Sequence, residues 1–563
     1  MKKYKSTLFL AFITIVAQAQ NLINFPDTVS GSNINLSIRD SSKQFFVGYN
    51  TKTIAYNGRY LGPTIFLNKG QNVSLNVTNN LADTTTTHWH GMHVSPSNDG
   101  SPHTMIMNGA TWSPSFSVLD FASTNWYHPH LHGKTMLQVL KGAAGLIIVR
   151  DSIERSLLLP RRYGIDDIPL VCQFQTFDTI TKQIKIDDEF DNYSMVNGTI
   201  KPMVNVPAQV VRLRILNASS HRVLQFGFND GRAFYQIATD EGLLNAPVSL
   251  TRLRLGSGER AEILVNFSGE TGQTFYINQF GNELPAGYPG GPAMMNSPIG
   301  PLDNVTFNFL QINVVSQTAS PITTIPTSLT TNNITSQNGA GTRTFLIQGS
   351  PNNSMTNFVI NGVKYNENVI NFTTKIDSTM IWQITNQSMM AHPWHIHGNH
   401  FYILTINGAA PPANMAGRKD VVLVPPQGGV VRLIMKYKDF ADTSMPYMYH
   451  CHILSHEDKG MMGQFVVKEK AGSTVGVNNI SMLSGIKIYP NPAREIINIW
   501  VNDYMAEQMV SLKMLNAFGN LVYSDNRIAS GSTQISTKDF AKGIYFIEIK
   551  RNAQVFNQKI IIE

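Results

Sequence analysis

Histidines in this chain gather into four short clusters that lie far apart in the sequence. Each cluster contains an H-x-H pair: His88-Trp89-His90, His128-Pro129-His130, His395-Ile396-His397 and His450-Cys451-His452. Side chains alternate along a β-strand, so such a pair directs both imidazoles to one face. A lone histidine is most often an ordinary surface or core residue, but four such pairs argue against chance. The fold must therefore allow eight imidazoles, carried on extended chain, to converge on one place.

The last cluster narrows the choice of metal. Imidazole alone suits Zn, Cu, Fe or Ni. Cys451, His392, His456 and a methionine supply a His₂Cys set with a weak axial Met, which is typical of a blue-copper electron-transfer site. A structural zinc site prefers several cysteines, and the chain has only two. On a strand, the neighbours of Cys451 point away from it, so the same strand can also serve a second metal cluster.

Four segments carry a family resemblance. They are HWHG at 88–91, WYHPHLHG at 126–133, HPWHIHG at 392–398 and HCHILSHEDKGMM at 450–462. They resemble the copper motifs of three-domain bacterial multicopper oxidases, and the resemblance covers roughly residues 25–470. It implies an all-β fold with three cupredoxin-like Greek-key β-barrel domains. It also implies four copper ions as cofactors: one type 1, one type 2 and a type 3 pair.

The resemblance assigns ligands position by position. The type 1 copper takes His392, Cys451, His456 and Met461; the type 2 copper takes His88 and His395; the type 3 pair takes His90, His128, His130, His397, His450 and His452. The remaining histidines are expected to be non-ligands: His93, His103, His132, His221 and His400. Of these, His132 extends a cluster and is expected to support a ligand. Electrons would enter at His392 and pass through Cys451 to its two histidine neighbours.

Two acids fall on positions where the family keeps carboxylates. Asp99 lies eleven residues after His88, beside the expected type 2 copper, and Glu457 directly follows His456. Reduction of dioxygen to two waters consumes four protons, so a proton-relay role is predicted for both acids. The alternatives are an acid that orients a ligand and an acid that is merely solvated.

The sequence pattern predicts how the chain divides into domains and linkers. Residues 62–81 alternate apolar and polar positions between Gly and Asn breaks, which is typical of β-strands. The expected segments are a signal peptide at 1–19, domain 1 at 20–152, domain 2 at 153–315, a linker at 316–340, domain 3 at 341–470, a linker at 471–484 and a C-terminal domain at 485–563. Domain 2 holds no predicted ligand and should be structural. The trinuclear cluster should lie between domains 1 and 3.

Both ends of the chain indicate export. A basic start, an apolar stretch over 6–16 and the Ala17-Gln18-Ala19 site read as a removed signal peptide that is too short to span a bilayer. The C-terminal segments YPNPA, GIYFIEI and KIIIE resemble the type IX secretion sorting domain. The plainer alternative is a small adhesive β-sandwich. We expect a secreted or cell-surface protein that meets the secretion machinery through this domain, with no membrane span.

The composition gives no indication of a nucleic-acid-binding protein. Charged residues make up 14% of the chain, and the net charge of +7 is not clustered. We find no basic run with interleaved aromatics, so no nucleic-acid partner is predicted. Cys172 is expected to be a small buried apolar residue.

The expected activity is laccase-like: oxidation of phenols or aromatic amines coupled to reduction of dioxygen. A cuprous oxidase for envelope copper detoxification is the alternative. Such enzymes carry methionines and acids near the type 1 histidine; here Met389 and Met390 precede His392, but Ser388 replaces the acid. Ordinary packing is the plainer interpretation of both methionines. A copper-free scaffold is the alternative outside the enzyme class, but such relatives have lost ligand histidines and here none is missing.

Overall fold

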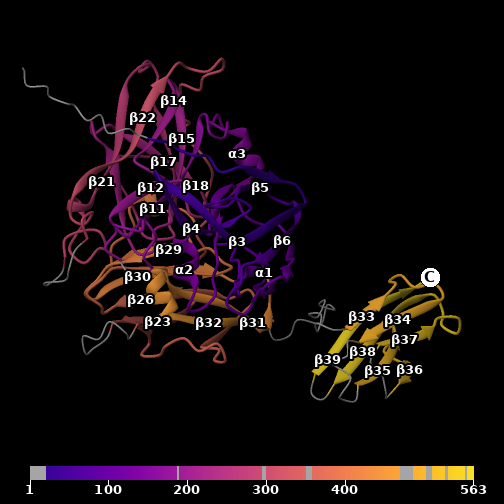
Figure 1. The fold of residues 1–563 in the computed structure, drawn as a ribbon. Coiled ribbons are helices and arrows are strands. Elements are labelled where there is room, and N and C mark those ends of the chain that lie inside the picture. Colours follow the sequence, from indigo (N-terminus) through magenta and orange to yellow (C-terminus); the bar gives the residue numbers. More distant parts are fainter. Residues whose placement is uncertain are drawn as a thin grey trace, which may run out of the picture. The chain divides into compact units, whose positions relative to one another are not determined.

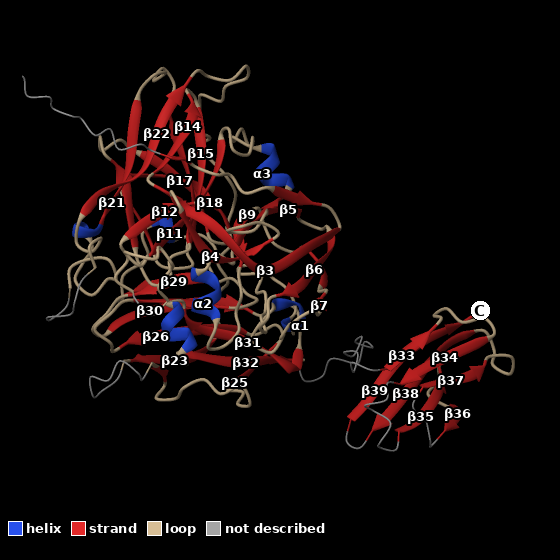
Figure 2. Ribbon diagram, viewed as in Figure 1, coloured by secondary structure: helices blue, strands red, loops and turns tan. Residues whose placement is uncertain are grey.

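The computed structural model describes most of the chain. The described residues are 21–186, 189–293, 300–349, 358–469, 486–501, 510–525, 531–551 and 554–563. The expected signal peptide at 1–19 and the linker at 471–484 lie outside them. The protein is 50% strand and 5% helix, and Figure 2 shows helices only as short segments among the strands. The predicted all-β class is therefore confirmed. The chain divides into two compact units, Met1–Lys470 and Ala471–Glu563.

The first β-sandwich pairs a sheet of order β2-β5-β10-β9 with one of order β4-β3-β6-β7, in which β8 also pairs with β6. Its strands are β2 Thr28–Ser30, β3 Asn33–Phe46, β4 Tyr49–Tyr56, β5 Thr64–Asn68, β6 Asn72–Asn80, β7 Thr111–Trp112, β8 Ser115–Ser117, β9 Ser123–Tyr127 and β10 Gly145–Arg150. Strand β6 shows why the sheet has an inner face. Val73, Leu75 and Val77 are buried while the residues between them are not, as period-two alternation requires.

The second β-sandwich has sheets of order β1-β14-β22-β21-β16-β19 and β13-β12-β11-β15-β20-β17-β18. Its strands are β1 Asn21–Leu22, β11 Asp167–Gln175, β12 Tyr193–Val196, β13 Thr199–Ile200, β14 Pro202–Pro207, β15 Val210–Asn217, β16 Leu224–Phe228, β17 Phe234–Thr239, β18 Gly242–Leu250, β19 Leu253–Leu255, β20 Arg260–Asn266, β21 Thr274–Phe280 and β22 Thr306–Val315. Strand β1 joins this sandwich by parallel pairing with β14, although it precedes the first sandwich in sequence.

The segment 316–340, which was expected to be a linker, is packed against the second sandwich. Leu329 is buried among the residues of β17, β18 and β20. The Val210 amide donates to the Ile322 carbonyl over 2.7 Å. These contacts hold the segment on the sandwich surface.

The third β-sandwich has sheets of order β24-β23-β26-β30-β28 and β25-β32-β31-β27-β29. Its strands are β23 Gly341–Gln348, β24 Val359–Ile360, β25 Phe372–Lys375, β26 Thr379–Asn386, β27 His392–Ile396, β28 Tyr402–Ile406, β29 Val421–Val424, β30 Gly429–Lys436, β31 Asp442–Cys451 and β32 Met462–Lys468. In Figure 1 the strands β23, β26 and β30 of one sheet and β31 and β32 of the other lie together in the orange part of the chain. Strands β27 and β31 are antiparallel neighbours, with Trp394 opposite Cys451 and His395 opposite His450.

Short helices connect the strands. They are α1 Pro96–Asp99, α2 Thr135–Leu140, α3 Ser152–Ser156, α4 Leu454–Asp458 and the 3₁₀ turns η1 Gly281–Glu283 and η2 Ala413–Met415. The Asp458 carboxylate of α4 accepts hydrogen bonds from the Thr135 and Met136 amides at 3.0 and 2.9 Å. The third sandwich thus caps a helix of the first. Within the described residues, no helix has the length and apolar character that a membrane crossing needs.

The C-terminal unit is a small β-sandwich, as predicted. Its sheets have the orders β33-β34-β37 and β36-β35-β38-β39. The strands are β33 Ile486–Tyr489, β34 Ile496–Val501, β35 Val510–Asn516, β36 Leu521–Asp525, β37 Gly531–Ser536, β38 Gly543–Arg551 and β39 Gln554–Ile562, yellow in Figure 1. Tyr545, Ile547 and Ile549 alternate into its core.

Candidate metal centres

The four H-x-H segments meet between the first and third sandwiches. Their ring nitrogens form three groups in which all atoms lie within 4.8 Å of one another: His88, His90 and His395; His90, His128 and His452; His130, His397 and His450. All eight side chains are buried. Each group takes histidines from both sandwiches, so the cluster exists only when the two sandwiches are packed together.

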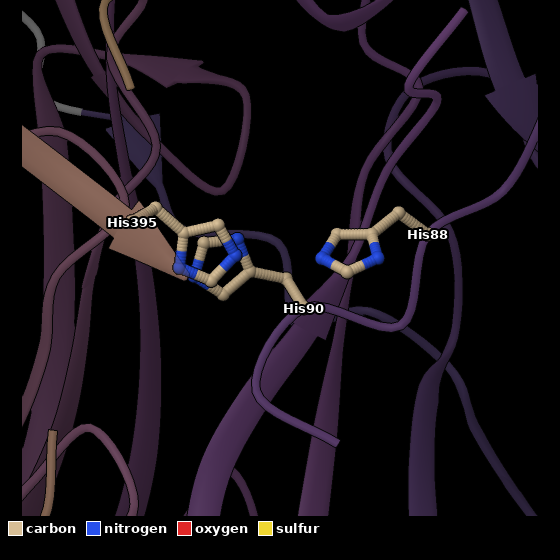
Figure 3. Close-up of side chains that lie close together, drawn as sticks. All are labelled: His88, His90 and His395. Atoms are coloured by element: carbon tan, nitrogen blue, oxygen red, sulfur yellow. The ribbon is translucent and has the colours of Figure 1, made fainter. Parts of the chain in front are cut away.

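Backbone pairing sets the positions within each sandwich. His88 and His128 form an isolated bridge, with hydrogen bonds of 2.8 and 3.1 Å in both directions. Strands β27 and β31 align His395 with His450. Across the interface, the His90 ring stacks on His395 with centroids 3.8 Å apart and planes 8° from parallel. Figure 3 shows this stack, with the His88 ring lying beside it.

Several ring nitrogens that face the cluster have no hydrogen-bond partner. These include Nε2 of His88, His395 and His452. Others face one another: His450 Nε2 lies 3.1 Å from His130 Nε2 and 3.2 Å from His397 Nε2. Buried polar atoms normally find partners, and neutral rings cannot satisfy so many converging lone pairs. Metal ions would satisfy them.

Outward-facing nitrogens of the same rings are held by backbone carbonyls. The distances are 2.9 Å from His88 Nδ1 to Asp99 O, 2.9 Å from His395 Nδ1 to Asp420 O, 2.9 Å from His128 Nδ1 to Pro129 O and 3.0 Å from His450 Nδ1 to Cys451 O. A ring that donates from Nδ1 presents its Nε2 lone pair inward, which is how proteins orient metal-binding histidines. Burial lowers the pKa of all eight imidazoles below 6.5, which keeps them in the neutral form that binds metal. The residues therefore fit copper ions.

The two acids singled out from sequence lie against these rings. Asp99 Oδ2 is 2.7 Å from His397 Nδ1. Glu457 lies 3.3 Å from His450 Nδ1 and 3.5 Å from His130 Nδ1. Burial raises the pKa of both carboxyls well above the ordinary range. This shift favours the protonated form of each acid beside the cluster.

A third acid, Asp420, was missed by the sequence reasoning. Its Oδ1 lies 3.5 Å from His90 Nε2, and its carbonyl holds His395, as given above. The only sequence signal is a Lys-Asp pair directly before the apolar strand β29. No spacing to a histidine motif distinguishes it from any buried ion pair.

A second group lies within the third sandwich. Cys451 Sγ is 3.2 Å from His392 Nδ1 and 3.7 Å from His456 Nδ1, and those two nitrogens are 3.4 Å apart. Helix α4 turns the chain so that His456 returns to the cysteine. Met461 is fully buried; its amide donates to the His456 carbonyl and its carbonyl accepts from the Cys451 amide, at 2.9 and 3.1 Å. Burial raises the pKa of the Cys451 thiol, so a bound cation is what would hold it as a thiolate.

The five other histidines lie outside these groups. His93 bonds the Gly398 carbonyl, His103 bonds Gln464, and His221 bonds Ser220. His400 is not part of any of the described metal-ligand groups. The side chain of His132 is exposed and its ring lies 5.1 Å from that of Tyr365. This differs from the predicted role of His132 in supporting a ligand.

A cavity of about 430 Å³ opens beside the cysteine group. His392, His456, Phe358, Met389 and Met390 are among the residues that line it. Met389 and Met390 are 47% and 40% exposed, so neither side chain is part of the buried core. Ser388 Oγ lies 2.7 Å from His392 Nε2. Cys172, by contrast, is buried in the second sandwich, as predicted.

Known proteins share this architecture. Residues 38–154 and 331–471 match the multicopper oxidase family, and residues 487–563 match a secretion system C-terminal sorting domain, which indicates secretion or the cell surface. Multicopper oxidase mco of Staphylococcus haemolyticus is 31% identical over 469 residues, covering 80% of this chain and 93% of the relative. Cell division protein FtsP of Sodalis glossinidius is 30% identical over 449 residues, covering 78% and 90%.

A solved structure agrees with these relatives. The laccase-like multicopper oxidase CueO of Ochrobactrum sp. is 32% identical with a TM-score of 0.71, covering 79% of this chain and all of that chain. The cupredoxin-like fold is thereby confirmed for the three large sandwiches. On these matches, and on the two histidine-rich groups that the fold assembles, the chain belongs to the multicopper oxidases, a family of copper-dependent oxidoreductases.

Proposed function

We propose that this protein is a laccase-like oxidase that couples four one-electron oxidations of phenols or aromatic amines to reduction of dioxygen to two waters. One observation carries the proposal. Eight buried imidazoles converge with free ring nitrogens, and one strand end joins them to a His₂Cys group. An electron carrier and a multi-electron centre in direct covalent connection are what such a coupling needs.

We assign four coppers to these residues. The type 1 copper would be held by His392, Cys451, His456 and Met461; the type 2 copper by His88 and His395; the type 3 pair by His90, His128 and His452 on one side and His130, His397 and His450 on the other. Bound copper supplies one-electron redox chemistry at the first site and dioxygen reduction at the other three. The grouping of the type 3 ligands follows the two three-histidine groups in the geometry.

Strand β31 gives the two centres a short connection. Cys451 belongs to the His₂Cys group, and its neighbours His450 and His452 belong to different imidazole groups. One peptide unit and the Cβ atoms of the two residues are all that separates the thiol from each of these rings. The residue pair Trp394–Cys451 keeps this strand end in register with β27, which carries His392 and His395.

Buried carboxyls would hold the protons that dioxygen reduction consumes. Asp99 reaches His397, and Glu457 lies between His130 and His450. Their raised pKa values favour the protonated form, and a carboxyl that gives up a proton beside these rings acts as a general acid. We propose a relay role for both.

The cavity beside His392 suits a small aromatic reductant. Its volume of about 430 Å³ lies in the usual range for small-molecule sites. Phe358, Tyr288 and Pro289 give it an apolar wall next to the His392 ring. The Ochrobactrum relative is described as having oxidase activity towards lignin model compounds, which supports a phenolic substrate class.

A cuprous oxidase is the second candidate, because the exposed thioethers of Met389 and Met390 share this cavity. Thioethers are soft ligands that suit Cu(I). A copper-free scaffold of the kind suggested by the FtsP relatives is disfavoured, because every ligand position of the family pattern is filled here.

Export completes the proposal. We propose that residues 1–19 are a signal peptide, and that type IX secretion machinery acts through a C-terminal domain at 485–563. The remaining boundaries, at 20–152, 153–315 and 341–470, are proposed as the three copper-oxidase domains.

Oxygen uptake by copper-loaded enzyme tests the function. We would compare 2,6-dimethoxyphenol with Cu(I) held in a chelator, and use Cys451→Ser as the inactive control. Fast uptake with the phenol, unchanged by added Cu²⁺, supports a laccase. Faster uptake with Cu(I), or phenol oxidation that requires added Cu²⁺, supports the cuprous oxidase. No uptake with either substrate by a fully loaded enzyme would contradict both.

A further inference from the structure

One segment of the second sandwich reaches the histidine cluster, although that sandwich contributes no residue to the imidazole groups of the described chain. Residues 256–260 connect β19 to β20 and are buried throughout. They end in Arg260, whose side chain is fully enclosed. A middle sandwich that served only as a spacer would have no need to place a charged side chain here.

The Arg260 guanidinium binds all three large sandwiches. In the first sandwich it donates to Thr124 O at 3.0 Å and to Asn125 Oδ1 at 3.1 Å. In the second sandwich it donates to Gly258 O and to Asp240 O, both at 3.2 Å. In the third sandwich it donates to both carboxylate oxygens of Asp420, at 2.5 and 2.7 Å. The two-pronged contact with Asp420 has the geometry that only arginine offers to a carboxylate. This side chain therefore fixes where Asp420 sits relative to the first sandwich.

Asp420 in turn contacts two imidazoles of the cluster. Its carbonyl accepts the hydrogen bond from His395 Nδ1 at 2.9 Å, and its Oδ1 lies 3.5 Å from His90 Nε2. These two rings come from different sandwiches and stack at 3.8 Å (Figure 3). The Arg260–Asp420 pair thus lies directly behind a stack that crosses the interface.

Close contacts leave no room for a side chain at two glycines, Gly258 of this segment and Gly91 beside it. Gly258 has φ +85°, and a Cβ there would lie 2.9 Å from His452 Cδ2. Gly91, the residue after His90, has φ +91°, and a Cβ there would lie 2.5 Å from Arg260 Nη2. Glycine is required at both because of the backbone angle and the close approach. The segment therefore touches the surroundings of His90, His395 and His452.

We infer that residues 256–260 of the second sandwich, through Arg260 and Gly258, position the His90–His395 stack and His452, and so set the copper affinity of the interface cluster. The inference rests on the copper assignment proposed above. It gives the sandwich that lacks ligands a direct part in building the cluster. Arg260 and Gly258 are positioning residues, because they act through Asp420 and the rings.

Full-length Arg260→Lys and Gly258→Ala variants test the inference. Arg212→Lys is the matched control, because Arg212 is another buried arginine of the second sandwich, paired with Glu262 and Glu154 away from the imidazoles. Copper affinity would be measured by chelator competition. The type 2 electron paramagnetic resonance signal would report the interface cluster, and the blue absorption band would report the cysteine group.

Arg260→Lys should lower the copper affinity of the interface cluster by about 10- to 100-fold, as loss of a residue that orients a ligand typically does, and should alter the type 2 signal. The blue band should stay. Arg212→Lys should lower the melting temperature and leave both spectra unchanged. Gly258→Ala should displace the His452 ring and lower the copper affinity of the interface cluster in the chelator competition. Equal loss of copper from both groups in Arg260→Lys, or normal interface affinity, would overturn the inference.

A structure of metal-free Arg260→Lys gives a readout that needs no copper. The His90 and His395 rings should separate from their 3.8 Å stack, and an unchanged stack would contradict the inference. Where Arg260→Lys does not fold, Asp420→Asn tests the same link from the other side with the same expected loss. Wild-type protein that binds no copper would contradict the proposed function instead.

Discussion

The two metal-ligand groups of this protein are built in different ways. The cysteine group takes His392, Cys451 and His456 from one sandwich, whereas the imidazole cluster takes its rings from two. The first depends on the register of β27 and β31 and on the turn of α4. The second depends on how two sandwiches pack. The cysteine group, a local group, is therefore formed within one sandwich, whereas the imidazole cluster forms only where two sandwiches meet.

Polar contacts rather than shared strands hold that interface near the cluster. Asp458 caps a helix of the first sandwich, His93 reaches the Gly398 carbonyl, and the Tyr447 hydroxyl donates to the Val94 carbonyl at 2.5 Å. Each such hydrogen bond contributes modestly to stability. Copper bound by rings from both sides would add a much stronger link.

The largest effect is expected from a substitution that removes the cysteine group and leaves the imidazole cluster in place. Cys451→Ser should abolish the blue band and reduce phenol oxidation to background, because the thiolate ligand and the connection to His450 and His452 are lost together. The interface cluster should still load copper. Absorbance, paramagnetic resonance and oxygen uptake check this. Full turnover by this variant would show that electrons do not travel through residue 451.

Copper removal should expose the difference in stability between the regions. At a thousandfold excess over Kd, a bound ligand adds about 4 kcal/mol to the free energy of unfolding. Chelation should therefore lower the melting temperature of unit Met1–Lys470 and leave the transition of unit Ala471–Glu563 unchanged. Scanning calorimetry with and without chelator measures this. An equal shift of both transitions, or none in the larger unit, contradicts the interface account.

Ser388→Asp should change the redox potential of the cysteine group and leave the imidazole cluster unchanged. A carboxylate at this position would accept the hydrogen bond from His392 Nε2 more strongly than the Ser388 hydroxyl, 2.7 Å away, can. It would make the ring a stronger donor and lower the type 1 potential by about 60 mV, equivalent to a tenfold change in a one-electron equilibrium. Redox titration of the blue band measures this, with the type 2 signal as an unchanged reference. A raised potential would contradict the argument.

Replacing both Met389 and Met390 by leucine should show whether the cysteine group is reduced by Cu(I) or by phenols. Because their exposed thioethers suit Cu(I), the double variant should lose Cu(I) oxidation selectively if the protein is a cuprous oxidase. Under the laccase proposal, phenol oxidation should change less than about threefold, since leucine keeps the apolar wall. A large loss of phenol oxidation would mean that the methionines do more than line the cavity.

The smallest expected effect concerns pH at the interface. Burial alone lowers the pKa of His93, but the Asp439 and Asp120 carboxylates outweigh it and raise the net pKa above 6.5. A raised folded pKa gives stability that is complete below pH 6.5 and is lost as pH rises through that higher value. His93→Gln should remove about 0.5 kcal/mol of this pH dependence, since the pair is partly exposed. Identical urea midpoints for both proteins across this range would contradict it.

The parts of the molecule that follow local periodicity could be predicted from sequence. Alternation along β6 predicted a sheet with one buried face. The H-x-H pairs predicted converging rings, and the rings do converge, although His88–His90 and His128–His130 lie outside the named strands. Cys451 could be recognised because its neighbours must point away from it. These features depend on a few consecutive residues and on strand geometry.

The features that were missed depend on tertiary packing. Asp420 and Arg260 are separated by 160 residues, and neither carries a motif. Strand β1 crosses to the second sandwich by a two-residue pairing, too short to leave a pattern. The exposure of Met389 and Met390 follows from a cavity whose walls come from distant segments. No single stretch of sequence encodes such contacts.

Copper counting on wild-type protein and Cys451→Ser tests the central claim most directly. Each full-length protein would be reconstituted, desalted and analysed for copper per chain. The account predicts four coppers in the wild type and three in the variant, because the local group holds one ion and the interface cluster keeps the others. Equal copper in both proteins, or loss of all copper from the variant, would contradict the division into a local group and an independent interface cluster.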